Sequence, residues 1–500
     1  MKRLLTLLIC ISLSLVFLSS SLNVYAANKS GWFYNSIDNS WCYYQNNILK
    51  TGWLYKSSKW YFFDTSGKMT VGWKYINNKW YYFNKSGSMR TGWLLTNDKW
   101  FFLNSSGSMR TGWMLYDDNW YYFNNSGSMR TGWFIYKDEW YYFDNTGEMH
   151  TSWLDYKSNQ YFFDDNGVMH QGRLKDGDII YYFNSSGEFL VSYEFTQLKT
   201  GNIIYVSTNG SDVTGDGSKE NPFATIWYAN STIKDNSAEN PYTIKVEDGI
   251  YTDLEERYST VTSDSYAGIN CKNYVTYEGN TEHPENVVLK WNGLKTEEQK
   301  QAGYFNGKTI FHIFNGVKTT IKGFTLDAVN TRYCLHAETG GLLNQETEWC
   351  VENCNLVWYG TPDAKTIVDR AVFGTGCVAG EKSLIRDCNF YNYAPKLSIS
   401  MFGSHDNTVH QKDVTLGSTI IFDSCYFYGE NTIVGNMDIV RLTFDSKSRN
   451  DYSENSKTYI INCDSSSPIF ISRNDNNFDK WGNHWDVFTY DSNMYDNYSY

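Results

Sequence analysis

Positive charge is scarce in this chain, and the shortage restricts what it can bind. Its 500 residues include 43 Lys and Arg against 55 Asp and Glu, which gives a formal net charge of −12 at pH 7. Proteins that bind nucleic acids neutralise the phosphates with Lys and Arg. We therefore exclude nucleic acid as a partner.

Long apolar runs are also missing after the first residues. A basic start, an apolar run over residues 4–18 and small residues at the cleavage positions of 24–26 predict a secretory signal peptide over residues 1–26. The run is short for a bilayer, which disfavours the alternative of a retained membrane anchor. We expect a secreted protein that begins near Ala27 and has no membrane span once the signal is removed.

A disulfide framework is missing as well. Without Cys10 in the signal, nine of the ten cysteines remain, an odd number in a compartment where disulfides persist. On one strand, Cys350 and Cys354 would lie about 13 Å apart, too far for a bridge or a shared metal. The similar phrases VENCNL, IRDCNF, FDSCYF and IINCDS hold Cys354, Cys388, Cys425 and Cys463. We interpret these cysteines as small buried residues, in preference to zinc ligands.

Aromatic residues, in contrast, are abundant, and many follow a period of 20 residues. Gly-Trp recurs at Trp53, Trp73, Trp93, Trp113 and Trp133, and a second Trp recurs at Trp60, Trp80, Trp100, Trp120 and Trp140. A block such as TGWLYKSSKWYFFDTSGKM has two aromatic-rich runs around a short turn, which predicts a β-hairpin. Because an isolated hairpin is marginal in water, the units must stack into a solenoid.

The alternation of side chains along a strand divides these rings between two faces. Trp60 and Phe62 share one face of their strand, and Tyr61 and Phe63 share the other. One face can fill the core while the other lines a box between hairpins. A box of ring faces beside a Met suits a quaternary ammonium, which offers no hydrogen-bond donor. The alternative is that all the rings are core, but a core needs hydrophobic volume and not Trp in every unit.

The blocks TGWLLTNDKWFFLNSSGSM and TGWMLYDDNWYYFNNSGSM resemble the choline-binding (cell-wall-binding) repeats of Gram-positive surface proteins, over about residues 31–193. The resemblance implies noncovalent attachment to choline-bearing teichoic acid of the cell wall, with each site shared by adjacent repeats. The sites it implies are Trp53, Trp60 and Tyr82; Trp73, Trp80 and Phe102; Trp93, Trp100 and Tyr122; Trp113, Trp120 and Tyr142; Trp133, Trp140 and Phe162. For the third ring, Tyr81 or its equivalents remain alternatives.

The last units depart from this pattern. Their Trp positions hold Gln160, Arg173, Ile180 and Tyr193, which removes ring faces, so we expect these units to act as caps. The composition then changes near Thr200. The expected organisation is therefore a signal peptide at 1–26, a cell-wall (choline) binding array at 27–200, and a second domain at 201–500 that ends in a cap.

The second domain consists of short β-rich runs broken by Gly, Asn and Asp, which indicates an all-β fold. Its cysteine phrases recur at loosely equal steps, as the coils of a parallel β-helix do. IYVSTNGSDVTGDGSKENPFATI, with KGFTLDA, VENCNL and IRDCNF, resembles right-handed parallel β-helix proteins of the pectate-lyase-like superfamily over about 205–465. That resemblance implies the fold and, for most members, action on a polysaccharide. The fold class predicted for the chain is all-β, a β-hairpin solenoid of about 20-residue repeats followed by this β-helix.

Candidate catalytic residues form three groups in the second domain. Glycan cleavage needs two carboxylates flanking the bond, or a base with a cation that neutralises a uronate. The groups are Asp327, His336 and Glu338; Asp369 and Arg370; and His405 and Asp406. The alternative for each residue is a structural role without catalysis, in a ladder of stacked polar side chains or in a turn. The reaction stays open between a polysaccharide lyase and a glycoside hydrolase, and a non-enzymatic adhesin that binds a glycan or host ligand remains the alternative.

No cofactor follows firmly from the sequence. Calcium is a candidate at Asp212 and Asp216 in NGSDVTGDGS. The alternative for these residues is an Asx-rich turn without a metal.

Overall fold

The computed structural model describes residues 29–177, 179–194, 198, 201–254, 267–292, 309–314, 316–337, 347–360, 371–377, 380–394, 400–406, 418–429, 440–445, 457–466, 469–473, 486–490 and 494–496. The predicted signal peptide lies outside these residues. The chain forms two compact units, Met1–His170 and Gln171–Tyr500. The described part is mainly β, with helices at α2 (Ile226–Thr232) and η1 (Pro284–Asn286). None of its helices has the length and apolar character that a membrane span requires.

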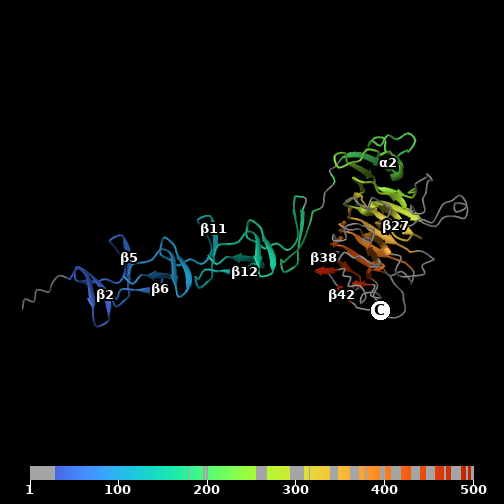
Figure 1. Ribbon diagram of the computed structural model, residues 1–500. Helices are drawn as coiled ribbons and strands as arrows, with labels where there is room; N and C mark the ends of the chain where they lie inside the picture. Colours follow the sequence, from blue (N-terminus) through green and yellow to red (C-terminus); the bar gives the residue numbers. More distant parts are fainter. Residues whose placement is uncertain are drawn as a thin grey trace, which may run out of the picture. The chain divides into compact units, whose positions relative to one another are not determined.

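The first unit is a file of antiparallel β-hairpins in chain order (Figure 1), which confirms the predicted hairpin repeats. It starts with a three-stranded sheet of β1 (Gly31–Asn35), β2 (Ser40–Gln45) and β3 (Ile48–Leu49). The hairpins that follow are β4 (Gly52–Lys56) with β5 (Lys59–Phe63), β6 (Gly72–Ile76) with β7 (Lys79–Phe83), β8 (Gly92–Thr96) with β9 (Lys99–Leu103), β10 (Gly112–Tyr116) with β11 (Asn119–Phe123), β12 (Gly132–Tyr136) with β13 (Glu139–Phe143), and β14 (Ser152–Tyr156) with β15 (Asn159–Phe163).

The turn of each hairpin fixes its register. Ser57 and Ser58 both have positive φ, 51° and 60°, as the two central residues of a type I′ turn require. The flanking strands pair so that Trp53 lies opposite Phe62 and Tyr55 lies opposite Trp60. One face of each hairpin therefore carries both tryptophans.

Each hairpin is joined to its neighbours by apolar packing and by the backbone. Phe63 and its equivalents are fully buried, and the backbone N–H of Met89 donates to the carbonyl of Trp60 at 2.7 Å. Each block ends in Gly-x-Met, as at Gly67 and Met69 or Gly87 and Met89. The glycine is required sterically, because a Cβ at Gly87 would lie 2.1 Å from Sδ of Met69 in the preceding unit. The methionine of one unit thus fills the space left by the glycine of the next.

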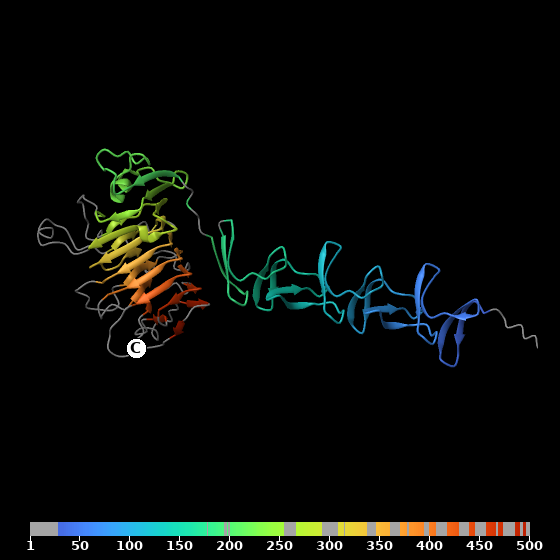
Figure 2. The same cartoon turned by 180° about the vertical axis from the view of Figure 1, so that it is seen from behind.

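The second unit contains three sheets whose strands all pair in parallel, and Figure 2 shows them from behind as a stack of rungs. The nine-stranded sheet holds β19 (Asn202–Val206), β20 (Tyr242–Val246), β23 (Val275–Glu278), β26 (Lys318–Lys322), β29 (Glu348–Glu352), β32 (Lys382–Arg386), β35 (Thr419–Asp423), β38 (Lys457–Ile461) and β41 (Asp486–Tyr490). The seven-stranded sheet holds β21 (Gly249–Tyr251), β24 (Val287–Asn292), β27 (Thr325–Val329), β30 (Asn355–Trp358), β33 (Asn389–Asn392), β36 (Tyr426–Gly429) and β39 (Asp464–Ser465). The eight-stranded sheet holds β22 (Ala267–Asn270), β25 (Thr309–Ile313), β28 (Leu335–Ala337), β31 (Ala371–Cys377), β34 (Ser400–Asp406), β37 (Val440–Asp445), β40 (Ile469–Arg473) and β42 (Met494–Asp496).

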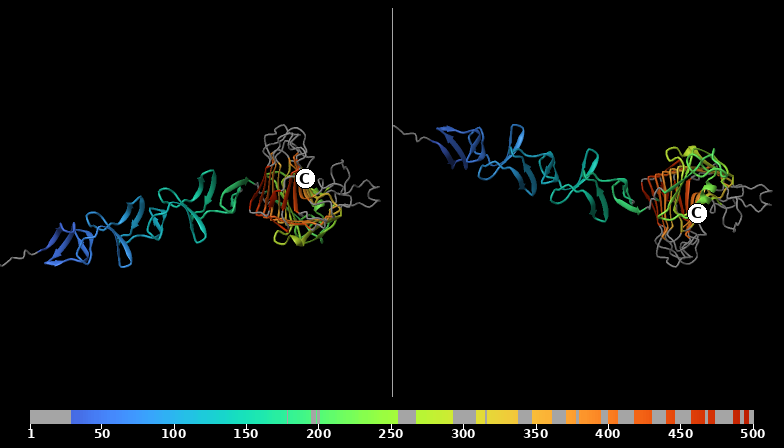
Figure 3. Two further views of the ribbon diagram at one scale, coloured as in Figure 1. Left: turned by 90° about the horizontal axis from the view of Figure 1, so that it is seen from below. Right: turned by 90° about the horizontal axis from the view of Figure 1, so that it is seen from above.

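In the middle of this unit the chain visits the three sheets in a repeating order, so each coil adds one rung to every sheet (Figure 3), which is consistent with a β-helix. A bend with positive φ joins a strand of the nine-stranded sheet to one of the seven-stranded sheet, at Asn353, Asp387, Ser424 and Asn462. Each of these residues directly precedes Cys354, Cys388, Cys425 or Cys463, and these four thiols are buried and free. The predicted burial of the cysteine phrases is thereby confirmed.

The last unit of the repeat pattern belongs to the second compact unit. Its three strands, β16 (Gly172–Asp176), β17 (Ile179–Phe183) and β18 (Phe189–Glu194), form one antiparallel sheet. Ile180, Tyr182 and Tyr193 pack in one apolar cluster with residues of the nine-stranded sheet: Cys350, Leu384, Ile421, Tyr459 and Ile461.

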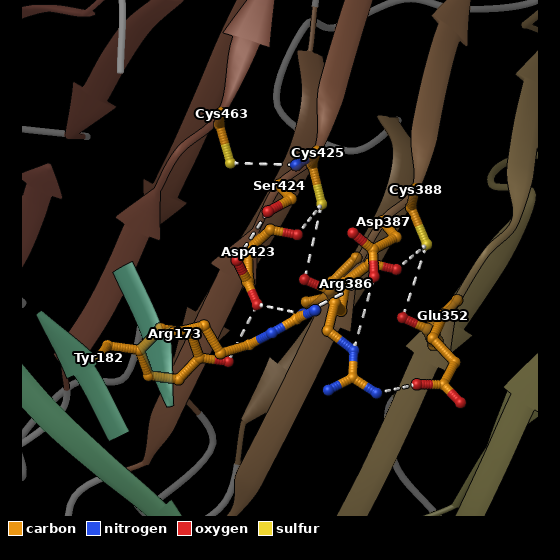
Figure 4. Close-up of polar contacts among 12 residues, drawn as sticks. Arg173, Tyr182, Glu352, Arg386, Asp387, Cys388, Asp423, Ser424, Cys425 and Cys463 are labelled. Carbon is orange, nitrogen blue, oxygen red and sulfur yellow. Dashed lines mark hydrogen bonds and ion pairs between the residues drawn. The ribbon is translucent and has the colours of Figure 1, made fainter. Parts of the chain in front are cut away.

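A buried carboxylate joins the same two sheets (Figure 4). Asp423, which is fully buried, accepts hydrogen bonds from Arg173 Nη1 at 3.0 Å and from the Tyr182 hydroxyl at 3.2 Å. Arg173 also lies 3.7 Å from Asp387. Burial and the neighbouring Asp423 raise the pKa of Tyr182, so this hydroxyl stays protonated and donates. Arg173, which stands where earlier units have Trp, therefore anchors this hairpin to the nine-stranded sheet.

Candidate functional site

The rings gather where consecutive hairpins meet, and we call each such boundary a junction. Junction 1 lies between β4–β5 and β6–β7, and junction 5 lies between β12–β13 and β14–β15. In junction 1, Trp53 and Trp60 stand edge to face with ring centroids 6.0 Å apart. Tyr81 of the next hairpin lies 5.1 Å from Trp53. Three rings from two hairpins thus converge.

This arrangement recurs along the unit. The paired tryptophans are 5.9–6.4 Å apart in all five junctions, and the third ring lies 4.8–5.1 Å from the first Trp. The sets are Trp53, Trp60 and Tyr81; Trp73, Trp80 and Phe101; Trp93, Trp100 and Tyr121; Trp113, Trp120 and Tyr141; Trp133, Trp140 and Tyr161.

The second Trp of each set is open to solvent. Trp60 is 44% exposed, Trp100 is 42% exposed and Trp140 is 37% exposed, whereas Phe63 in the same hairpin pattern is fully buried. The hypothesis that every ring belongs to the core therefore does not account for these tryptophans. Exposed ring faces beside partly buried ones can hold a cation that carries methyl groups.

The predicted third rings lie elsewhere in the hairpins. Tyr82 is 5.3 Å from Trp73 of its own hairpin, and Phe102, Tyr122, Tyr142 and Phe162 likewise contact the first Trp of their own hairpins. The ring contacts bring Tyr81 and its equivalents to the preceding tryptophans, but three of these equivalents, Tyr121, Tyr141 and Tyr161, are buried at 7–9% exposed. The third ring of each site therefore stays a prediction. Neighbouring residues of a strand point to opposite faces, and the type I′ register sets which hairpin each ring contacts.

The sequence did not assign a site to the first hairpin, yet it has similar contacts. Trp32 lies 4.9 Å from Tyr61 of the next hairpin, and Trp32 and Trp41 are 36% and 44% exposed. At the other end, Trp153 is 38% exposed, but Gln160 stands where the second Trp would be. Trp32 thus repeats the contact of the first Trp with the next hairpin, and the last hairpin lacks the second Trp.

Two junctions also carry a carboxylate. The hydroxyl of Tyr121 in junction 3 donates to Glu148 at 3.1 Å, and the hydroxyl of Tyr141 in junction 4 donates to Glu139 at 2.9 Å. Burial and these carboxylates raise the pKa of each tyrosine to about 12. Negative charge is therefore held beside two of the ring sets.

The candidate catalytic residues of the second unit do not form one described cluster. Asp327 on β27 pairs with Lys290 at 3.1 Å in the seven-stranded sheet. His336 on β28 is buried in the eight-stranded sheet, so these two lie in different sheets. His405 and Asp406 lie on β34, but only their backbone is described. Glu338, Asp369 and Arg370 lie outside the described residues.

His336 has aromatic neighbours that the sequence analysis did not single out. Its ring stacks on Tyr333 at 4.5 Å and on His312 at 5.5 Å, with interplanar angles of 5° and 10°. Gly374 makes room for this stack, because a Cβ there would lie 2.4 Å from the Tyr333 ring. The coil period could have pointed to His312, because residues one coil apart pair in register and His312 pairs with His336 on the neighbouring strand.

Asp212 and Asp216, the candidate calcium ligands, accept hydrogen bonds from neighbouring residues of the chain. Asp212 accepts hydrogen bonds from the backbone N–H of Ala224 and of Thr225 and from the Thr225 hydroxyl, at 2.7–3.0 Å. Asp216 accepts from the backbone N–H of Ser218 at 2.9 Å. These contacts fit the turn alternative, and the described residues contain no group of three or more His, Cys, Asp or Glu that could hold a metal ion.

Family models match within the array. A choline-binding repeat model matches residues 70–111 and 110–153, and a putative cell wall binding repeat model matches residues 51–69, 151–169 and 174–189. Choline-binding repeats are therefore well supported in the N-terminal half of the chain. A search of curated proteins finds no match.

Solved structures from Streptococcus pneumoniae are similar to part of the chain. Choline binding protein F, solved in the presence of a peptidoglycan analogue, is 35% identical over 33% of this chain and 58% of its own, with a TM-score of 0.31. CbpJ is 32% identical over 33% of this chain and 66% of its own, with a TM-score of 0.31. The choline-binding domain of CbpL is 25% identical over 28% of this chain and 78% of its own, with a TM-score of 0.24. The chain thus spans less than two thirds of the first two.

Proposed function

We propose that this protein is secreted and binds the choline of teichoic acid at the junctions of its hairpin array. The observation that carries the proposal is the recurrence of two tryptophans and one ring of the next hairpin, with the second Trp exposed in every junction. A trimethylammonium group makes no hydrogen bond, so ring faces are its natural neighbours. Each cation–π contact at an exposed site contributes roughly 0.5–1 kcal/mol.

Several weak sites on one chain strengthen attachment to a polymer with many choline groups. Once one junction has bound, the next choline is held at high effective concentration. The array would therefore keep the protein at the wall although each junction alone exchanges quickly. Free choline at high concentration would compete for every junction and release the protein.

The test uses the full mature chain on an immobilised quaternary amine. We expect retention and release by free choline. Trp93→Ala with Trp100→Ala removes both tryptophans of junction 3 and should lower the choline concentration needed for release. Tyr359→Ala, which removes a similarly exposed ring (42%) from the second unit, is the matched control. A protein that passes through the column unretained would refute the proposal.

We further propose that the second unit is a right-handed parallel β-helix that acts on an extracellular polysaccharide. Support comes from three parallel sheets visited in a repeating order and from the His312, His336 and Tyr333 stack on one of them. Incubation of the protein with acidic and neutral glycans should release new reducing ends or an unsaturated uronate. Retention of a glycan without its consumption would favour the adhesin alternative.

A further inference from the structure

The five junctions differ at the last residue of the first strand. In the hairpin that closes junctions 3, 4 and 5 this residue is a tyrosine: Tyr116, Tyr136 and Tyr156. In the hairpin that closes junctions 1 and 2 it is Ile76 and Thr96. The repeat is therefore not uniform where it meets its neighbour.

The three tyrosines occupy the same place in their junctions. Tyr136 lies 5.8 Å from Trp113 and 5.7 Å from Tyr122, both on the preceding hairpin. The corresponding distances are 5.8 and 5.5 Å for Tyr116 and 5.7 and 5.7 Å for Tyr156. Each thus adds a fourth ring beside the first Trp.

The charge at one position also differs between the junctions. The first residue of the second strand in the closing hairpin is Lys79 in junction 1, Lys99 in junction 2, Asn119 in junction 3, Glu139 in junction 4 and Asn159 in junction 5. Glu139 accepts from Tyr141, and Glu148 accepts from Tyr121 in junction 3. Junctions 1 and 2 therefore place an ammonium where junction 4 has a carboxylate, and a cationic ligand is repelled by the first and attracted by the second.

We infer that the junctions form two classes, with junctions 3 and 4 the strong sites for a quaternary ammonium and junctions 1 and 2 weak ones. The inference rests on the proposed choline binding and adds which residues set its strength. The fourth ring covers more of the methyl groups, and the carboxylate offsets the positive charge. The inference concerns junctions 1–4; junction 5 has the ring Tyr156 and, like junction 3, an Asn at the first position of the second strand.

The expected difference follows from the two contributions. One added cation–π contact at an exposed site corresponds to about 2- to 5-fold in affinity. Exchange of a nearby Lys for a Glu adds a further factor of about 2 to 10 at low salt, and this factor shrinks as ionic strength rises. Strong and weak sites should therefore differ by about tenfold in dissociation constant.

Exchanging the residues between junctions tests this inference. In the full mature chain, Tyr136→Thr with Glu139→Lys gives junction 4 the residues of junction 2. Thr96→Tyr with Lys99→Glu makes the reverse exchange, and both of its positions are solvent-accessible. Calorimetric titration with choline chloride at low salt should show two affinity classes. The first variant should lose one strong site and the second should gain one.

The outcomes separate the two proposals. Equal affinities in all junctions, or an unchanged number of strong sites in both variants, would overturn the inference while choline binding stands. An absence of any binding heat in the native chain would remove the proposed function itself. The thermal midpoint of each variant without choline shows whether it folds, and the gain in the second variant cannot be produced by partial unfolding.

Discussion

At the scale of single residues, one step along a strand decides which hairpin a ring contacts. Tyr81 faces the preceding hairpin while Tyr82 faces the Trp of its own hairpin. Composition and spacing are the same for both residues. The assignment therefore depends on the cross-strand register that the two-residue turn imposes.

The hydrogen bond between Tyr141 and Glu139 should be detectable through the pKa of Tyr141. Burial and Glu139 raise the pKa of Tyr141 to about 12, so the neutral phenol is favoured in the folded state. Its contribution to stability is present below the ordinary value near 10 and is lost as pH rises through the folded value. Glu139→Gln should lower this pKa, measured by the alkaline absorbance change of phenolate, whereas Asp138→Asn should not. An identical titration for all three proteins would contradict the contact.

At the scale of elements, the hairpins could be predicted and the position of the last one could not. The 20-residue period, the turn residues and the aromatic runs specify each hairpin locally. Arg173, Ile180 and Tyr193 were recognised as departures from the repeat, and a cap was expected. Their packing against a sheet more than 150 residues away depends on partners such as Ile421 and Asp423, which no local pattern reveals.

The anchor of this hairpin can be tested through Asp423. Arg173→Met leaves a fully buried carboxylate without its charged partner and should lower the free energy of unfolding of the second unit by about 2–4 kcal/mol, below the range for a fully buried pair because Arg173 is 39% exposed. Adding Asp423→Asn should recover part of the lost free energy of unfolding, because the double variant has no unpaired buried charge. Denaturant unfolding of the full chain measures both.

Lys382→Met is the control for this pair, because Lys382 is exposed on the same sheet and its loss should change stability by less than about 0.5 kcal/mol. Equal stability of Arg173→Met and the native chain would show that the apolar cluster alone holds the hairpin.

At the scale of the whole molecule, sequence and structure agree on a mainly β chain with hairpin repeats followed by parallel sheets. The cysteine phrases predicted the coil period because each of the four cysteines follows a bend with positive φ at the same place in its coil. The candidate catalytic groups were less predictable. Asp327 and His336 are close in sequence but lie in different sheets, since the chain turns a corner between β27 and β28.

The central claim is that choline binds in the junctions, and a crystal of the full mature chain grown with choline tests it most directly. We predict density for a trimethylammonium group against Trp93, Trp100 and Tyr121 in junction 3, and against Trp113, Trp120 and Tyr141 in junction 4. Junctions without density for choline at saturating concentration, or choline bound only away from these rings, would contradict the account.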